Sequence, residues 1–205
     1  MRLEGEFLMQ YSASAIKYSL WFVETRETAR MLTEHSPEEV RNTVIEQNIY
    51  QQKDRGRTIN EYGCIIRRLE AIPENLKALL LKTDVSTAKL IVLISAMASD
   101  RLFFELMHDV YRRKLHLGEE ELKDSDWNIF IGNKAEQSEL IAGWTDGTLK
   151  RLKSSYTKYL LEAGLVRKEG SRRKLIARPY LDVELRQILL QESMTGYLHA
   201  LTGEQ

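Results

Sequence analysis

The basic side chains of this sequence are concentrated in one stretch, residues 145–178. The stretch contains ten lysines and arginines and three acidic residues, so its formal charge is +7. Lysine and arginine bind phosphate oxygens, and serine and threonine hydroxyls bind phosphates and base edges. Such side chains hold a nucleic-acid backbone without any covalent step. Residues 145–178 are therefore the first candidate for a functional surface.

A helix is predicted to present part of this surface. Thr145 is a good amino-terminal cap, and the helix should continue to about Ala163, before Gly164 ends it. On a helical wheel the apolar residues form one stripe that should pack on a core: Leu149, Leu152, Tyr156, Leu160 and Ala163. The opposite face and the amino end supply candidate DNA contacts: Thr145, Thr148, Lys150, Arg151, Ser154, Ser155 and Lys158.

A β-hairpin is predicted directly after that helix. Residues 165–168 and 172–178 have the pattern of two short strands, and the turn between them contains Gly170. Three basic residues near its exposed tip are further candidate DNA contacts: Arg172, Arg173 and Lys174. The order of helix, short helix, long helix and basic hairpin matches a winged helix-turn-helix. In that fold the long helix recognises DNA and the hairpin is the wing.

The charge balance of the whole chain agrees with one localised basic surface. The 205 residues include 30 Lys and Arg and 30 Asp and Glu, so the formal net charge is zero. Residues 1–144 carry −4 and residues 179–205 carry −3, which cancels the +7 between them. Neutrality therefore does not exclude a nucleic-acid partner. Charged residues at 29% and apolar residues at 43% indicate a soluble globular protein.

The chain before this stretch is predicted to be helical. Ser36, Pro37 and Glu39 have the spacing of a capping box at a helix start. Residues 87–99 are apolar nearly all round, which is typical of the buried centre of a bundle. Gly118 and the acidic run after it mark a change in composition. The predicted fold is mainly α, with a helical bundle domain at 1–118 and a winged helix-turn-helix domain with a small β-hairpin wing at 119–205.

A second basic cluster lies in the predicted bundle. Asp54 and Glu61 offset part of its charge, so ordinary surface charge is the favoured interpretation. A second nucleic-acid surface is the alternative. The cluster consists of Lys53, Arg55, Arg57, Arg67 and Arg68.

The sequence offers no pattern for catalysis, a metal or a cofactor. It lacks phosphate-binding glycine loops and nucleophile motifs, and its one cysteine, Cys64, is expected to pack as a small apolar residue. A single cysteine also indicates a cytoplasmic protein. The most apolar run, residues 90–98, is about half the length that spans a bilayer, so no membrane partner is expected. The histidines lack the spacing of metal ligands: His35, His108, His116 and His199.

Five segments of the chain, taken together, resemble one known protein family. They are WFVETRETA (21–29), VIEQN (44–48), RRLE (67–70), WTDGTL (144–149) and LEAGLV (161–166). The resemblance extends over about residues 11–166, and it is to the BrxA family of the bacterial BREX bacteriophage-exclusion systems. The order and spacing of the segments are more specific than any one of them.

The resemblance implies a helical, non-enzymatic DNA-binding protein that works in a multi-protein phage-defence system. The implied partners are double-stranded DNA and other BREX proteins, among them a methyltransferase. The resemblance also implies a NusB-like fold for the amino-terminal bundle, and it supplies no catalytic motif. Two alternative functions stay open: a protein-interaction scaffold of the defence complex, and a transcriptional regulator of its own operon. The sequence specifies no oligomeric state.

Overall fold

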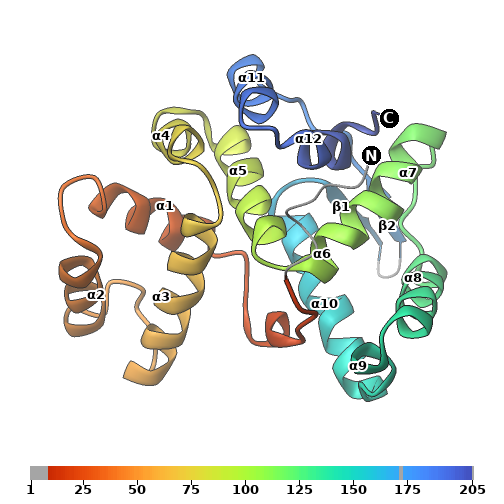
Figure 1. The fold of residues 1–205 in the computed structure, drawn as a ribbon, viewed down its shortest axis with the longest axis horizontal. Helices are drawn as coiled ribbons and strands as arrows, with labels where there is room; N and C mark the ends of the chain where they lie inside the picture. The colour runs from red at the N-terminus through yellow and green to blue at the C-terminus, as the bar shows by residue number, and fades with distance from the viewer. Residues whose placement is uncertain (1–8, 171–172, 205) are drawn as a thin grey trace. The chain divides into compact units, whose positions relative to one another are not determined.

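The computed structural model of the chain describes residues 9–170 and 173–204. The chain packs into two compact units, whose elements are labelled in Figure 1. Leu20–Ser99 is the amino-terminal helical unit. The carboxy-terminal unit combines the segment that ends at Ser19 with the chain from Asp100 onward.

The amino-terminal helical unit has α5 (Val85–Ala98) as its most buried helix, as its apolar sequence predicted. The Asp84 carboxylate caps α5 by accepting the backbone N–H of Ser86 at 2.8 Å. The predicted capping box is also confirmed, because Glu39 accepts the Ser36 N–H at 2.8 Å and Ser36 accepts the Glu39 N–H. The other helices of this unit are α1 (Phe22–Met31), α2 (Pro37–Glu46), α3 (Arg55–Glu70) and α4 (Glu74–Lys82).

The carboxy-terminal unit contains helices and one antiparallel hairpin. Its helices are a 3-10 helix (Ser14–Lys17), α6 (Arg101–Leu106), a π-helical turn (Met107–Tyr111), α7 (Arg112–Leu117), α8 (Asp124–Gln137), α9 (Glu139–Ala142), α10 (Asp146–Glu162), α11 (Val183–Gln191) and α12 (Thr195–Thr202). Strands β1 (Val166–Glu169) and β2 (Arg173–Ile176) form the hairpin. Helix α12 was not predicted, because Gly196 and the threonines at both ends have low helix propensity.

Three helices of the carboxy-terminal unit share an aromatic core. Phe103 of α6 lies 4.9 Å from Tyr156 of α10, measured between ring centroids. Trp127 of α8 lies 6.0 Å from the same Tyr156 ring. Asp100 caps α6, and its carboxylate also accepts the Tyr156 hydroxyl at 3.0 Å. Aromatic packing and this part-buried hydrogen bond therefore fix α6, α8 and α10 against one another.

The chain from residue 101 to 117 packs with later parts of the sequence. The π-helical turn contacts α8 and α12, and α7 also contacts α12. These helices were predicted to belong to the first domain, whereas the packing divides the chain between Ser99 and Asp100. The mainly helical fold with one small antiparallel hairpin is confirmed for the described residues. The domain boundary near Gly118 stays a prediction.

A buried carboxyl group in α3 gives the amino-terminal helical unit a pH-dependent stability. Glu61 is 2% exposed, and its Oε2 accepts the Gln52 side-chain amide at 2.7 Å. Its Oε1 has no hydrogen-bond partner among the described residues. Burial, with the charge of Glu24, raises the pKa of Glu61 from 4.5 to about 7. Since the folded-state pKa is the higher one, stability is greatest below about pH 4.5 and is lost as the pH rises through about 7.

Glu61→Gln is expected to raise the free energy of unfolding at pH 8 by about 1–2 kcal/mol and to change it little at pH 4.5. Glutamine fills the same space but brings no charge into the buried site. Urea denaturation at both pH values measures the effect. Glu70→Gln, at an exposed position of the same helix, is the control and should stay within about 0.5 kcal/mol of the wild type. Equal stability of Glu61→Gln and wild type at pH 8 would contradict this prediction.

Candidate nucleic-acid interface

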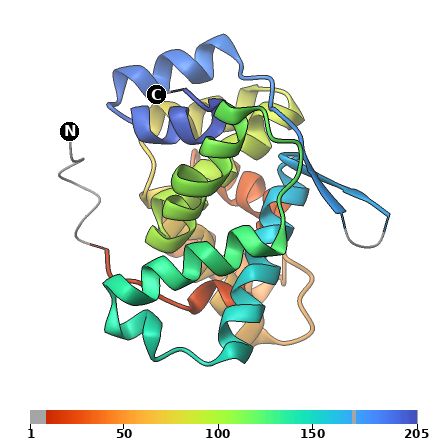
Figure 2. The same ribbon diagram turned by 90° about the vertical axis from the view of Figure 1, so that its right-hand side faces the viewer.

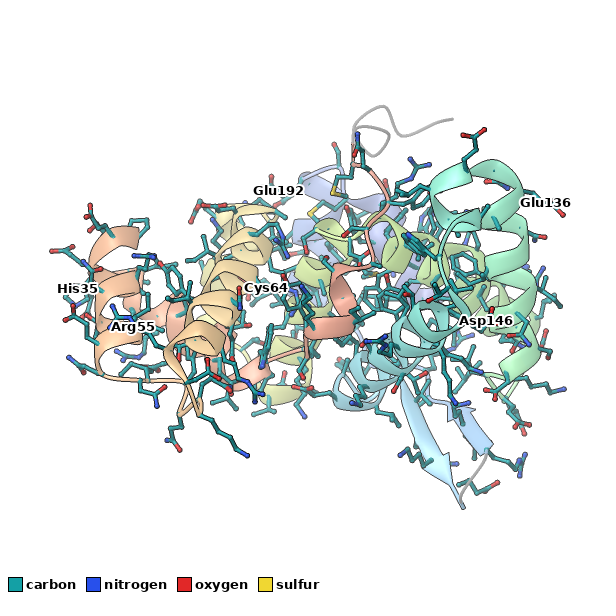
Figure 3. All side chains as sticks on the ribbon, turned by 90° about the horizontal axis from the view of Figure 1, so that it is seen from below. His35, Arg55, Cys64, Glu136, Asp146 and Glu192 are labelled. Atoms are coloured by element: carbon teal, nitrogen blue, oxygen red, sulfur yellow. The ribbon has the colours of Figure 1, made fainter. Side chains whose placement is uncertain are left out.

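Helix α10 begins and packs as the sequence predicted. Thr145 caps it, because its Oγ1 accepts the backbone N–H of Thr148 at 3.2 Å. The predicted apolar stripe faces the core at Leu152, Tyr156, Leu160 and Ala163, which are buried, and Leu149 is half-buried. Figure 3 labels Asp146, the first residue of the helix. The opposite face of α10 is therefore the one available to a partner.

The exposed face of α10 carries cations that are not neutralised by nearby carboxylates. Lys150, Arg151, Ser154 and Lys158 are all exposed, as expected. The Arg151 Nε donates to the Gly147 carbonyl at 3.3 Å. Within the described residues, no carboxylate lies within 4.0 Å of these three cationic groups. These cations therefore face solvent without a described carboxylate beside them.

Ser155 does not belong to this face, so its prediction as a DNA contact is wrong. Its side chain is 7% exposed. The buried positions of α10 are Leu152, Ser155, Tyr156, Tyr159 and Leu160. Spacings of three, four, seven and eight residues define a broad apolar stripe, and Ser155 falls inside it. The buried stripe of α10 is therefore wider than the predicted one.

The β1–β2 hairpin is held by two other segments of its unit. The hydroxyl of Tyr111, in the π-helical turn, lies within hydrogen-bond distance of the carbonyl oxygens of Leu165 (3.2 Å) and Ala177 (2.9 Å). Residues 120–122 run along the outer edge of β2, where Leu122 N–H donates to the Lys174 carbonyl at 2.9 Å. Figure 2 shows β1 and β2 projecting from the helices of their unit. The base is fixed while the strands remain accessible.

The basic residues of the hairpin differ in how far they are neutralised. Arg167 and Lys168 of β1 are exposed, and no described carboxylate lies within 4.0 Å of either. Arg173 of β2 forms an ion pair with Glu169 and lies 3.7 Å from a Glu121 carboxylate oxygen. Arg172, a predicted DNA contact, lies outside the described residues. Arg167 and Lys168 thus supply two cations without a described carboxylate partner. Both belong to the +7 segment, but neither was among the predicted DNA contacts.

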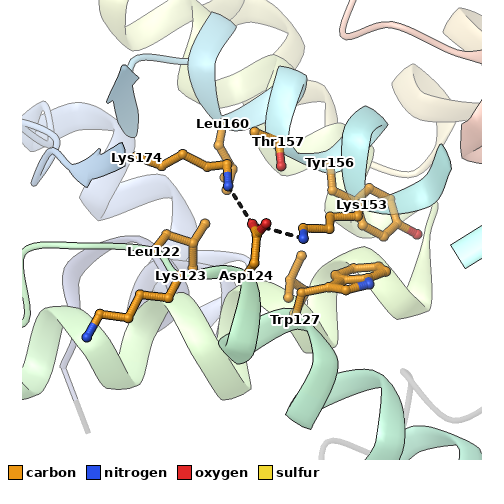
Figure 4. Close-up of a pocket in the computed structure, with 10 residues that line it drawn as sticks. Leu122, Lys123, Asp124, Trp127, Lys153, Tyr156, Thr157, Leu160 and Lys174 are labelled. Carbon is orange, nitrogen blue, oxygen red and sulfur yellow. Dashed lines mark hydrogen bonds and ion pairs between the residues drawn. The ribbon is translucent and has the colours of Figure 1, made fainter. Parts of the chain in front are cut away.

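Lys174 is bound within the protein and shares its partner with Lys153 of α10. Figure 4 shows both ammonium groups at the carboxylate of Asp124, the first residue of α8. Lys153 Nζ lies 2.9 Å and Lys174 Nζ 2.7 Å from the same oxygen, Asp124 Oδ1. These two lysines lower the pKa of Asp124 to about 2. No sequence pattern indicated this arrangement, because its residues come from three separate elements.

The second basic cluster lies in the amino-terminal helical unit, and one of its members is wrongly assigned. Arg68 is 3% exposed, and its guanidinium donates to the Leu20 carbonyl at 2.9 Å and lies 5.9 Å from the Trp21 ring centroid. Arg68 therefore supports the fold instead of facing a partner. Arg57 forms an ion pair with Asp54 at 3.1 Å. The exposed members are Lys53, Arg55, Arg57 and Arg67.

Other kinds of site find little support in the described part of the chain. No three His, Cys, Asp or Glu side chains of residues 9–170 and 173–204 are placed to hold a metal ion. Cys64 is buried, as expected for a small apolar residue. None of the described helices combines the length and apolar composition needed to cross a membrane. The exposed basic surface of α10 and β1 is thus the strongest candidate site.

Comparison with known proteins agrees with the resemblance found in the sequence. The sequence model of the BrxA family matches residues 9–193. A Bacillus cereus (strain H3081.97) protein named BREX protein BrxA is 33% identical over 195 residues, which cover 95% of this chain and 97% of that protein. An Escherichia coli O9:H4 (strain HS) protein of the same name is 21% identical and aligns over 85% of this chain and 81% of its own length.

A solved structure shares the fold. The crystal structure of an uncharacterized protein from Magnetospirillum magneticum superposes with a TM-score of 0.80 at 19% identity, covering 96% of this chain and 100% of that one. Such a likeness shows the fold alone. The family match over most of the chain, and the relative that is 33% identical over nearly its whole length, decide the family. The chain belongs to the BrxA family.

Proposed function

We propose that this chain is a non-enzymatic, DNA-binding component of a BREX phage-defence system. Its relatives are named BREX proteins, which supports the defence role and partners among other BREX proteins. One observation carries the DNA-binding part of the proposal. Five exposed cations of α10 and β1 have no carboxylate beside them in the described chain: Lys150, Arg151, Lys158, Arg167 and Lys168.

The order of elements in the carboxy-terminal unit supports a winged helix-turn-helix. The helix at 101–117 is followed by the edge segment 120–122, then by α8, the short α9, α10 and the β1–β2 hairpin. The first of these helices, α8 and α10 share the aromatic core described above. In this reading α10 is the recognition helix and the hairpin is the wing. The helix at 101–117 then belongs to the DNA-binding domain.

Contacts to phosphates should dominate, and sequence preference should be weak. The exposed face of α10 carries lysine, arginine and serine, and the helix contains no asparagine or glutamine for bidentate contacts to adenine. Thr145 or Thr148 can present a hydroxyl to a phosphate at the amino end of the helix, where the backbone N–H groups of the first turn also favour an anion. Binding should therefore be strongly salt-dependent, since each phosphate contact releases counterions.

Fluorescence anisotropy with a labelled duplex of mixed sequence tests the proposal. Five phosphate contacts correspond to a slope of log affinity against log salt of about −4.5, a loss of about 500-fold from 50 to 200 mM. Unlabelled duplexes of different sequence should compete about equally. Absence of binding at the lowest salt, or affinity that does not change with salt, would overturn the proposal.

A scaffold function is the second candidate, and one observation favours it. Tyr180, Val183 and Leu190 are large apolar side chains in and just before α11, and all three are exposed. Pull-down of other BREX proteins after nuclease treatment separates the two candidates, because a scaffold keeps its partners and a DNA tether loses them.

Two further features stay predictions for the amino-terminal helical unit. One is the NusB-like fold, and the other is a second nucleic-acid surface at Lys53, Arg55, Arg57 and Arg67.

A further inference from the structure

The Asp124 carboxylate joins three elements of the carboxy-terminal unit through one oxygen atom. Asp124 begins α8, Lys153 lies on α10 and Lys174 lies on β2. The Oδ1 atom of Asp124 stands 2.9 Å from Lys153 Nζ and 2.7 Å from Lys174 Nζ. An anionic oxygen between two ammonium groups is also the arrangement that a non-bridging phosphate oxygen would adopt there.

The two lysines are held in place by more than this ion pair. Their side chains are only 25% and 21% exposed, whereas the Asp124 side chain is 66% exposed. They line a pocket whose apolar walls include Trp127 and Leu160 (Figure 4). Packed stems leave the charged heads at the surface in preset positions. The carboxylate is the exposed member of the cluster and the one that another anion can replace.

A lysine without a carboxylate partner among the described residues lies beside each of the paired ones. Lys150 precedes Lys153 by three residues on α10, so the two side chains are neighbours on the helix surface. Lys168 of β1 is the direct cross-strand partner of Lys174, so these two point to the same face of the hairpin. The cluster is therefore continuous with the proposed DNA-binding surface on both α10 and β1.

We propose that Lys153 and Lys174 form a binding site for a phosphate of the DNA backbone, which Asp124 occupies in the free protein. On binding, the phosphate takes both ammonium groups and the Asp124 carboxylate turns to solvent. The inference rests on the proposed function. Asp124 lowers the affinity for DNA in this arrangement, because two ion pairs must be exchanged and a carboxylate is left beside the phosphates.

The variant Asp124→Asn tests this inference against a matched control. At 100 mM salt it should bind the duplex about 3- to 30-fold more tightly than the wild type, with a salt slope steeper by about 0.9. The control is Glu136→Gln, near the other end of α8 (Figure 3), about 18 Å away along the helix. That distance exceeds the Debye length of about 10 Å, so the control should change affinity less than twofold.

A double-mutant cycle identifies the groups through which Asp124 acts. Lys153→Met with Lys174→Met keeps the apolar stems and removes both ammonium groups. In that background Asp124→Asn should bring a much smaller gain in affinity, because no ion pair then has to be exchanged. A gain of the same size there would mean that Asp124 acts as a general surface charge, and would overturn the proposed site.

A second measurement covers the case in which Asp124→Asn lowers the melting temperature. Carbon-13 NMR of the wild-type Asp124 carboxyl group at neutral pH should show a shifted signal when duplex saturates the protein. An unshifted signal with bound DNA would overturn the exchange. If wild type and Asp124→Asn both fail to bind at 50 mM salt, the proposed function falls together with this inference. If the wild type binds and Asp124→Asn gains nothing, only the masked phosphate site is wrong.

Discussion

Replacing Lys150, Arg151 and Lys158 together by glutamine is expected to lower the affinity for duplex DNA by about 10²- to 10³-fold at 0.1 M salt. These three cations lie on the exposed face of α10, and no described carboxylate neutralises them. Each lost phosphate contact lowers the magnitude of the salt slope by about 0.9 and weakens the free energy of binding by about 1.2 kcal/mol at this salt. Three lost contacts therefore amount to about 3.7 kcal/mol. Anisotropy titrations over a salt series measure both quantities.

The matched control replaces Lys53, Arg55 and Arg57 by glutamine. These exposed residues of the amino-terminal helical unit give the same change in net charge. If α10 binds the DNA, the affinity of this variant for the duplex should fall less than about threefold. Thermal melting should show that both triple variants are folded, because all six substituted positions are exposed. An equal loss in the two variants would contradict a binding site localised on α10. It would instead favour the second nucleic-acid surface.

Replacing Lys134 by methionine is expected to lower the free energy of unfolding by about 3–5 kcal/mol. Lys134 of α8 is 10% exposed, and its Nζ lies 2.8 Å from Glu105 Oε2 and 2.9 Å from Asp109 Oδ2. Burial lowers the pKa of Lys134, but the hydrogen bonds that Lys134 donates to Glu105 and Asp109 outweigh this effect, so its pKa lies above the ordinary value. Methionine keeps the apolar stem but leaves two carboxylates without this cation.

Chemical denaturation of wild type and variant measures this loss. Lys77→Met, which breaks the surface pair of Lys77 with Glu74 (2.6 Å), is the control and should cost less than about 1 kcal/mol. Adding Glu105→Gln and Asp109→Asn to Lys134→Met should recover part of the loss, since those carboxylates then carry no charge. Similar small losses for Lys134→Met and Lys77→Met would show that the buried cluster contributes no more than a surface pair.

The π-helical turn explains why two interactions could not be predicted from the sequence. They are the Asp109–Lys134 ion pair and the hydrogen bonds of Tyr111 at the base of the hairpin. Residues 101–117 have the pattern of one continuous helix, and the helix is indeed unbroken. The wider turn at Met107–Tyr111 directs Asp109 toward Lys134 and Tyr111 toward the base of the hairpin. Such turns are often found at functional sites, here beside the proposed wing. Their position depends on packing, so local propensity does not reveal them.

The sequence by itself determined the features that depend on neighbouring residues. The caps at Ser36 and Thr145 were predictable because capping needs only a side chain and the next few backbone N–H groups. The buried stripe of α10 and the hairpin after it follow from local periodicity and turn residues. The concentration of basic charge in residues 145–178 was a matter of counting.

Only the tertiary structure decided which of those charges are free. Ser155 and Arg68 are buried by packing, and neither position is marked by its residue type. Lys153 and Lys174 meet Asp124 across separations of 29 and 50 residues, and Arg173 meets Glu121 across 52. Ion pairs act through space and fall off over a few ångströms, so a sequence gives the number of charges but not their partners. The fold therefore divides the described cations of the +7 segment into those paired with carboxylates of the protein and those without such a partner, which the proposed function assigns to DNA.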